Sequence, residues 1–171
     1  AFAITPIGCA QRPDDLIAWW TGDDTAIDKT GLNLDARLLY GASYGSGIVG
    51  RAFQFDGGES YASFGDLSLL QNTDGLTISV WVNKMDNNNP YAGILGKWTG
   101  NSTDTTLDFL LYNGEDNRNA GAFAIRTGES QISILNGATP ITPGRWTHIL
   151  ALWRRSDGLM QLYKNGRLDG E

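Results

Sequence analysis

Acidic and amide side chains are concentrated in the stretch of residues 22–33. Hard cations such as Ca²⁺ take six to eight oxygen ligands from carboxylates, amides and backbone carbonyls in turns. The candidate ligands are Asp23, Asp24, Asp28, Asn33 and, from a later Phe-Asp-Gly turn, Asp56. These residues predict a structural calcium site. Asp and Asn also favour turns for reasons of their own, so a set of solvated turn residues is an equal alternative.

A second set of residues has the chemistry of a carbohydrate site. An aromatic ring packs against the apolar face of a pyranose, and amide groups bond its hydroxyls. The candidate sugar contacts are Tyr91, Trp98, Tyr112 and Asn113. Trp98 stands where a strand should leave its sheet, and both a core and a rim position remain open for it. Trp81 and Trp146, by contrast, are expected to fill the core.

The signatures of catalysis are weak. Glycoside hydrolysis needs two carboxylates about 5 to 10 Å apart across the scissile bond, and the four Glu lie in turns or at the end of the chain. Asp108 is the one acidic residue that enters a predicted strand, and we interpret it as an edge or turn-end carboxylate. His148 is the single histidine, so we expect it to be partly buried and hydrogen-bonded. We therefore predict no enzyme, with a polysaccharide-degrading enzyme as a minor alternative.

Short strands must carry these residues. The 171 residues include 22 Gly and six each of Trp, Tyr and Phe, a composition typical of a β-rich domain. Runs of strand length are separated by Gly, Asn and Asp turns. We predict about ten strands, over residues 16–20, 52–56, 61–64, 76–82, 93–97, 108–112, 122–126, 131–135, 146–153 and 159–164.

Composition and charge exclude some classes of function. A chain of 171 residues with 41% apolar residues is long enough for one packed domain. Its 13 Lys and Arg against 19 Asp and Glu give a formal net charge of -6. This charge removes the attraction to phosphate backbones, so we expect no nucleic-acid partner. No apolar run approaches the roughly 20 residues of a membrane-spanning helix.

The start of the chain differs from the rest. Residues 1–15 change from apolar to polar and precede the regular patterning, so we expect an N-terminal arm followed by one domain over 16–171. Ile7-Gly8-Cys9 faintly resembles the lipidation point of a lipoprotein signal. A mature arm that packs on its own domain or on a neighbour is the favoured interpretation.

The end of the chain poses a pairing problem. Asn165-Gly166 predicts a tight hairpin turn, which demands a returning strand beyond Leu168. The chain ends at Glu171, and we expect this to be too soon for that strand. Its partner would then come from elsewhere in the chain or from another subunit, because an open strand edge promotes association.

Several segments in order resemble the laminin-G-like jelly roll of the concanavalin A-like lectin/glucanase superfamily. They are Ile17-Ala18-Trp19-Trp20-Thr21-Gly22-Asp23-Asp24, Gly47 to Gly57, Leu76 to Val82, Ile94 to Lys97, Gly144 to Ile149 and Leu162 to Gly166. The resemblance runs from about Leu16 to Leu168. It implies an all-β, two-sheet antiparallel jelly-roll sandwich, apparently lacking its last strand or strands. It also implies that a structural calcium in the turn after the first strand is common.

The resemblance implies a fold more firmly than a function. Together with the acidic surface, it favours a secreted, extracellular, non-catalytic recognition module whose partner is a glycan or an extracellular protein. The alternative is a structural or adhesive subunit of an extracellular assembly or filament, in which the N-terminal arm completes the sheet of another copy of the chain. The missing returning strand and the odd Cys9 favour that alternative.

Overall fold

The computed structural model describes residues 15–65, 70, 73–85, 89, 91–98, 108–115, 119–127 and 131–171. Within these residues all paired strands are antiparallel, so the prediction of an antiparallel all-β fold is confirmed. No helix in this part of the chain is long and apolar enough to cross a membrane. The predicted arm, apart from Asp15, lies outside the described residues, and so does Cys9. The chain divides into two compact units, Ala1–Asp66 and Leu67–Glu171.

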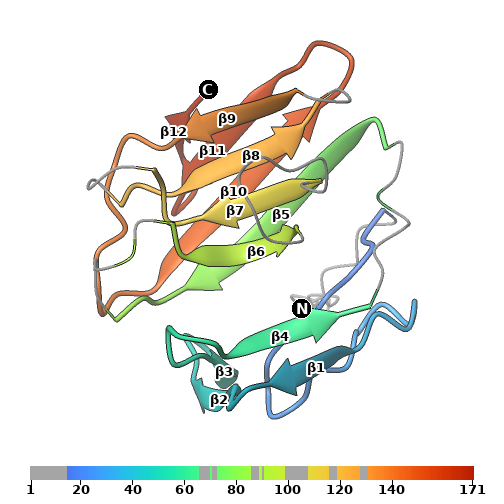
Figure 1. The fold of residues 1–171 in the computed structure, drawn as a ribbon, viewed down its shortest axis with the longest axis vertical. Helices are drawn as coiled ribbons and strands as arrows, with labels where there is room; N and C mark the ends of the chain where they lie inside the picture. Colours follow the sequence, from blue (N-terminus) through green and yellow to red (C-terminus); the bar gives the residue numbers. More distant parts are fainter. Residues whose placement is uncertain are drawn as a thin grey trace, which may run out of the picture. The chain divides into compact units, whose positions relative to one another are not determined.

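The first unit contains two small sheets (Figure 1). β1 (Ala36–Leu39) pairs with β4 (Tyr61–Phe64), and β2 (Ser43–Ser46) pairs with β3 (Arg51–Gln54). β3 and β4 match predicted strands. β1 and β2 were not predicted, because neither has a clear alternation of apolar and polar residues and each depends on pairing with a later strand.

Residues 16–20 do not form the predicted strand. The Trp19 N–H donates to Asp28 Oδ1 at 3.0 Å, and the Trp19 carbonyl accepts from the Lys29 N–H at 2.8 Å. The following loop thus supplies the bonds that a neighbouring strand would make. Trp20 anchors the segment, since its Nε1 donates to Leu34 O at 2.7 Å and its ring centroid lies 4.0 Å from that of Phe64.

The second unit is a sandwich of two four-stranded sheets (Figure 1). The long-strand sheet has the order β12-β11-β10-β5 and consists of β5 (Gly75–Val82), β10 (Thr147–Arg154), β11 (Met160–Lys164) and β12 (Arg167–Gly170). The short-strand sheet has the order β6-β7-β8-β9 and consists of β6 (Gly93–Lys97), β7 (Phe109–Tyr112), β8 (Ala122–Arg126) and β9 (Ile132–Asn136).

Alternating residues of both sheets form the core of the second unit. In β10, Ile149 and Ala151 are fully buried, whereas Leu150 between them is partly exposed. Leu111 and Phe123, on neighbouring strands of the short-strand sheet, are in register and fully buried. Burying side chains of this size contributes about 1.5 to 3 kcal/mol each. Side chains that alternate with a period of two thus place one face of each of these strands in the core.

Trp81 is an exception to the predicted core. It is 47% exposed and lies in register with His148, with the two ring centroids 5.1 Å apart. Alternation along β5 places it on the face of Thr77 and Ser79, which are exposed. The expectation that Trp81 fills the core is therefore wrong, because its position in the alternation decides its face.

The Asn165-Gly166 turn is followed by the strand that it requires. Both residues have positive φ, 48° and 78°, as a type I′ turn needs. In β12, Leu168 pairs with Tyr163, and a register shift beside this pair leaves Asp169 of β12 without a register partner in β11. The expectation that the chain ends too soon for a returning strand is wrong, because a strand of four residues is enough.

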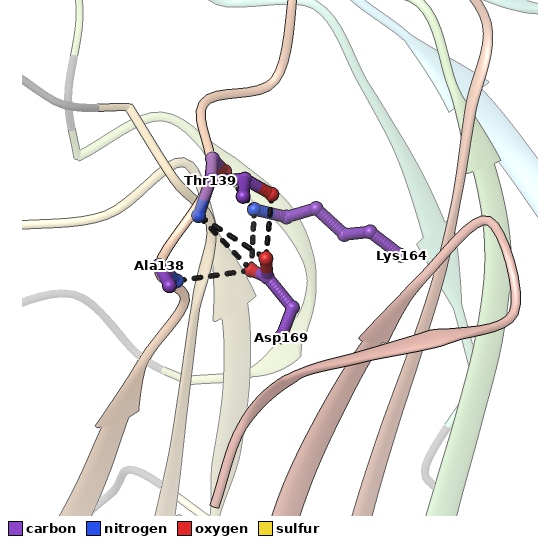
Figure 2. Close-up of polar contacts among 4 residues, drawn as sticks. All are labelled: Ala138, Thr139, Lys164 and Asp169. Carbon is purple, nitrogen blue, oxygen red and sulfur yellow. Dashed lines mark hydrogen bonds and ion pairs between the residues drawn. The ribbon is translucent and has the colours of Figure 1, made fainter.

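A buried ion pair ties the β11–β12 hairpin to the segment after β9 (Figure 2). Lys164 Nζ lies 2.7 Å from Asp169 Oδ2, and both side chains are at most 7% exposed. The same carboxylate accepts from the N–H groups of Ala138 and Thr139 at 3.0 and 3.1 Å and from the Thr139 hydroxyl at 2.5 Å. Lys164 also donates to the Thr139 carbonyl. Four donors therefore surround one carboxylate.

Candidate functional site

Asp28 organises the acidic loop of the first unit. It is 5% exposed, and its carboxylate accepts from the Trp19 N–H at 3.0 Å and the Leu34 N–H at 3.4 Å. It also accepts from the N–H and the hydroxyl of Thr30, at 2.9 and 2.5 Å. Burial by itself would raise the pKa of Asp28, but the hydrogen bonds, led by those of Thr30, outweigh it and lower the pKa from 3.8 to about 2. Asp28 is therefore an ionised acceptor for donors of its own chain.

Asp23 and Asp24 both interact with Arg51. Asp23 Oδ1 accepts from the Arg51 N–H at 2.8 Å, and Asp24 Oδ1 lies 2.8 Å from Arg51 Nε. Asp24 has φ 51°, which is a turn conformation that Asp adopts more readily than most residues. These two carboxylates join the start of β3 to the turn after residue 20.

Asp56 and Asn33 are also turn residues. Asp56 Oδ1 accepts from the Ser60 hydroxyl at 2.6 Å and from the Gly58 N–H at 2.8 Å, and these bonds lower the pKa of Asp56. Asn33 is exposed and has φ 61°. Among the residues that the structure describes, no group of three or more His, Cys, Asp or Glu is placed to hold a metal ion. The carboxylates of Asp23, Asp24, Asp28 and Asp56 accept bonds from their own chain, and a calcium site formed by the five predicted ligands stays a prediction.

The structure separates the predicted sugar contacts. Tyr91 precedes β6 and Trp98 follows it, so at about 3.3 Å per residue the two are roughly 20 Å apart along the strand. Both are on the surface, with 64% and 44% of their area exposed. No single pyranose reaches both rings.

Asn113 belongs to a buried cluster of loop residues. It is 5% exposed, and its Nδ2 donates to Asn89 O at 2.9 Å and to Asn119 Oδ1 at 2.5 Å. Its Oδ1 accepts from Lys84 Nζ at 2.9 Å. The Asn113 amide thus links three loops of the second unit, and these bonds occupy its oxygen and its NH₂ group.

Tyr112 is a core residue of the short-strand sheet. It is 4% exposed and packs with Ala122, Ala124 and the partly buried Leu110. Burial, followed by a hydrogen bond with Glu115, raises the pKa of its hydroxyl well above the usual value. Because its ring is covered, Tyr112 presents no face to a sugar in this structure.

Trp98 lies at the end of the short-strand sheet where β6 ends and β7 begins. There Lys97 Nζ pairs with Asp108 Oδ2 at 3.2 Å, and the Asp108 N–H donates to the Lys97 carbonyl at 3.0 Å. Asp108 is thus a paired, turn-end carboxylate, as its interpretation from the sequence stated.

His148, the other candidate for chemistry, lies on β10 with its Nε2 2.8 Å from Ser79 Oγ, so the expectation of a partly buried, hydrogen-bonded histidine is confirmed.

A cavity of about 370 Å³ opens at this same end of the sandwich, lined by residues of both sheets. This volume lies within the range of about 300 to 1,000 Å³ of ligand pockets. The lining residues are Leu70, Thr73, Leu76, Asp108, Phe109, Ile125, Arg126, Trp153 and Arg155. Sequence reasoning missed the site, because antiparallel pairing brings its parts together: Phe109 is in register with Ile125, and Trp153 with Leu76.

Comparison with known families agrees with this architecture. A family model described as the concanavalin A-like lectin/glucanases superfamily matches residues 56–171. The chain belongs to this superfamily, and the match includes the sandwich, Trp98 and the cavity. Laminin-G-like domains are often extracellular, non-catalytic binding modules, although the superfamily also includes glycosidases. Searches of curated proteins and of solved structures gave no match.

Proposed function

We propose that this chain is a secreted, non-catalytic recognition module that binds carbohydrate at the end of the short-strand sheet where Trp98 lies. The exposed indole of Trp98 carries the proposal. A flat aromatic face matches the C–H groups of a pyranose ring, and aromatic contacts of this kind contribute strongly to interfaces. Membership of a superfamily rich in binding modules supports the same function.

The surface beside Trp98 suits a flat ligand. A row of residues in register crosses all four strands of the short-strand sheet: Gly96, Leu110, Ala124 and Ile134. A Cβ on Gly96 would lie 2.7 Å from Leu110 Cδ1, so Leu110 occupies the space that glycine leaves. Ile134, at the other end of the row, is 45% exposed. Ala124 is 4% exposed and packs with Tyr112, so the part of this row that reaches the surface beside Trp98 is Gly96 with the partly buried Leu110.

The environment of Asp108 supports a non-catalytic module. A hydrolase of this kind needs one carboxyl group as acid and a second carboxylate opposite it, about 5 to 10 Å away. The Asp108 carboxylate faces the Lys97 ammonium at 3.2 Å instead. We therefore assign Asp108 the role of holding the end of β6 against β7.

One argument for the alternative role, that of a structural or adhesive subunit, no longer holds. It drew on the expected absence of a returning strand, and β12 provides that strand. Its other element, the arm of residues 1–15, lies outside the described residues apart from Asp15. Association with copies of the chain therefore stays a prediction, and carbohydrate recognition is the function that the surface supports best.

Affinity electrophoresis in gels that contain a panel of polysaccharides tests the proposal. We expect retardation of the wild-type chain by at least one polysaccharide and its loss in Trp98→Ala. Trp81→Ala is the matched control, because Trp81 is exposed to a similar extent but lies on the long-strand sheet. Retardation by no polysaccharide, or equal loss in the two variants, would contradict the proposal.

A further inference from the structure

We propose that Asn165 is a site of spontaneous covalent modification, at which the side-chain amide is lost as ammonia and the residue becomes aspartate or isoaspartate. Asn165 and Gly166 form the exposed tight turn between β11 and β12. The inference rests on this turn and does not depend on the proposed carbohydrate surface.

The reaction needs only the chain and water. Hydroxide removes the proton of the Gly166 main-chain nitrogen, and this nitrogen attacks the side-chain carbonyl carbon of Asn165. A C–N bond forms, the bond to the side-chain NH₂ group breaks, and ammonia leaves after taking a proton from water, which restores the hydroxide. Water then opens the succinimide ring at either of its carbonyl groups. One opening gives aspartate, and the other gives isoaspartate.

The sequence contains three Asn-Gly pairs, and the structure describes all of them. Glycine favours the reaction because it has no Cβ to crowd the attacking nitrogen. The pairs are Asn113-Gly114, Asn136-Gly137 and Asn165-Gly166. Because the two reacting residues are the same in each pair, differences in their rates must come mainly from the fold.

The fold protects the first two pairs. The Gly137 N–H donates to the Gly121 carbonyl at 2.9 Å, and a Cβ on Gly137 would collide with the Ala120 carbonyl oxygen. Asn113 is 5% exposed, and both its side-chain oxygen and its NH₂ group are hydrogen-bonded. Gly137 and Gly114 are both buried. Attack at either pair therefore requires local opening of the structure.

The Asn165-Gly166 pair is accessible. Both residues are exposed, and a Cβ on Gly166 would meet no atom within 4 Å apart from its chain neighbours. The Gly166 N–H has no hydrogen-bond partner among the described residues. Asn165 Oδ1 accepts from the His148 N–H at 3.0 Å. This donor stabilises the negative charge that develops on the oxygen during attack, as donors to an oxyanion do in acyl transfer.

The isoaspartate product is incompatible with the β11–β12 turn. Its main chain runs through the former side chain and is longer by one methylene group, so a two-residue type I′ turn cannot form. β12 includes Asp169, whose carboxylate lies 2.7 Å from Lys164 Nζ. Loss of the turn therefore weakens the hairpin that carries this buried ion pair, and the chain becomes less stable as it ages.

Incubation of the folded chain in mildly alkaline buffer, followed by peptide mapping with mass spectrometry, tests the proposal. Conversion at Asn165 should be faster than at Asn113 and Asn136 by about tenfold or more, as expected when hydrogen bonds must break before those pairs react. In guanidinium chloride the three rates should become similar. The proposal is wrong if Asn165 does not lead in the folded chain, or if its lead persists in the unfolded chain.

The effect on the hairpin is tested with Asn165→Gly, because Gly-Gly also suits a type I′ turn but has no side-chain amide. The urea midpoint of the wild-type chain should fall during the incubation, whereas that of Asn165→Gly should stay constant. Asn136→Ser is the matched control and should lose stability as the wild type does. An equal fall in the wild type and Asn165→Gly, or a constant wild-type midpoint despite conversion at Asn165, would overturn this consequence.

Discussion

The buried pair of Lys164 and Asp169 should respond unequally to loss of its two members. Asp169→Ala leaves the Lys164 ammonium buried with the Thr139 carbonyl as its remaining acceptor. Lys164→Met leaves the Asp169 carboxylate with three donors, from Ala138 and Thr139. An uncompensated buried charge costs about 3 to 5 kcal/mol, whereas loss of one bond from a carboxylate that keeps others costs about 1.5 to 3 kcal/mol. The aspartate variant is therefore expected to be the less stable of the two.

The pKa shifts of the pair agree with this asymmetry. Burial lowers the pKa of Lys164, so the folded state disfavours its charge and gains stability only as the pH rises through the lowered pKa. Burial would raise the pKa of Asp169, but bonds from Lys164 and Thr139 outweigh it and lower the pKa. The stability that Asp169 contributes is present above pH 3.8 and is lost as the pH falls through its lowered pKa.

Urea unfolding near pH 7, followed by circular dichroism, measures the free energies. The double variant Lys164→Met/Asp169→Leu should recover much of the loss seen in Asp169→Ala, because a buried ion pair replaced by apolar side chains is often neutral. Equal destabilisation by the two single variants, or a loss below about 1 kcal/mol in Asp169→Ala, would refute the reasoning. A double variant as unstable as Asp169→Ala would show that packing, not charge, decides the outcome.

Two further predictions concern the acidic loop of the first unit. Asp28→Asn should lower stability by about 2 kcal/mol above pH 4, because the pKa of Asp28 falls from 3.8 to about 2 on folding, and the difference from wild type should shrink as the pH falls toward 2. Urea unfolding across this pH range checks it, with Asp24→Asn as a control of small effect, and a difference that does not change with pH would contradict the role of the charge. Because the carboxylates of this loop and that of Asp56 accept bonds from their own chain, we expect a chelator to leave the melting temperature unchanged. Native mass spectra before and after chelation check this, and loss of a bound calcium would restore the site predicted from the sequence.

The sequence predicted best those strands whose residue pattern and flanking turns are both visible locally. β6 and β8 match their predicted ranges, because their apolar and small residues lie between clear turn signals. β1 has no alternation of apolar and polar residues and pairs with the distant β4, and β2 is short, polar and glycine-containing, so neither displays a clear local pattern. The same reason explains Trp153 and Arg155: each looks like an ordinary residue near the end of a strand until β5, β7 and β8 are brought beside it.

The candidate sites show how little residue type alone says about whether a side chain is available to a ligand. Tyr112 and Asn113 have side chains suited to sugar binding, but residue type does not reveal which side of a sheet or loop is covered. Asp28 has the right chemistry for calcium, but its neighbours in the loop provide enough N–H and O–H donors to occupy it. Burial and the supply of competing partners set the surroundings of these side chains, and both are properties of the folded chain.

The attachment of residues 16–20 to the Asp28 loop has a consequence for mutational tolerance. Trp19 contributes its backbone N–H and carbonyl to this attachment, while its side chain is 50% exposed. Any side chain other than proline keeps that N–H, so position 19 is open to sequence drift. Asp28 has no such freedom, because its two oxygens must reach donors on both sides of the loop, and the longer side chain of Glu would place them elsewhere. Variation should therefore accumulate at position 19 while position 28 remains fixed, although the tryptophan is the more conspicuous residue.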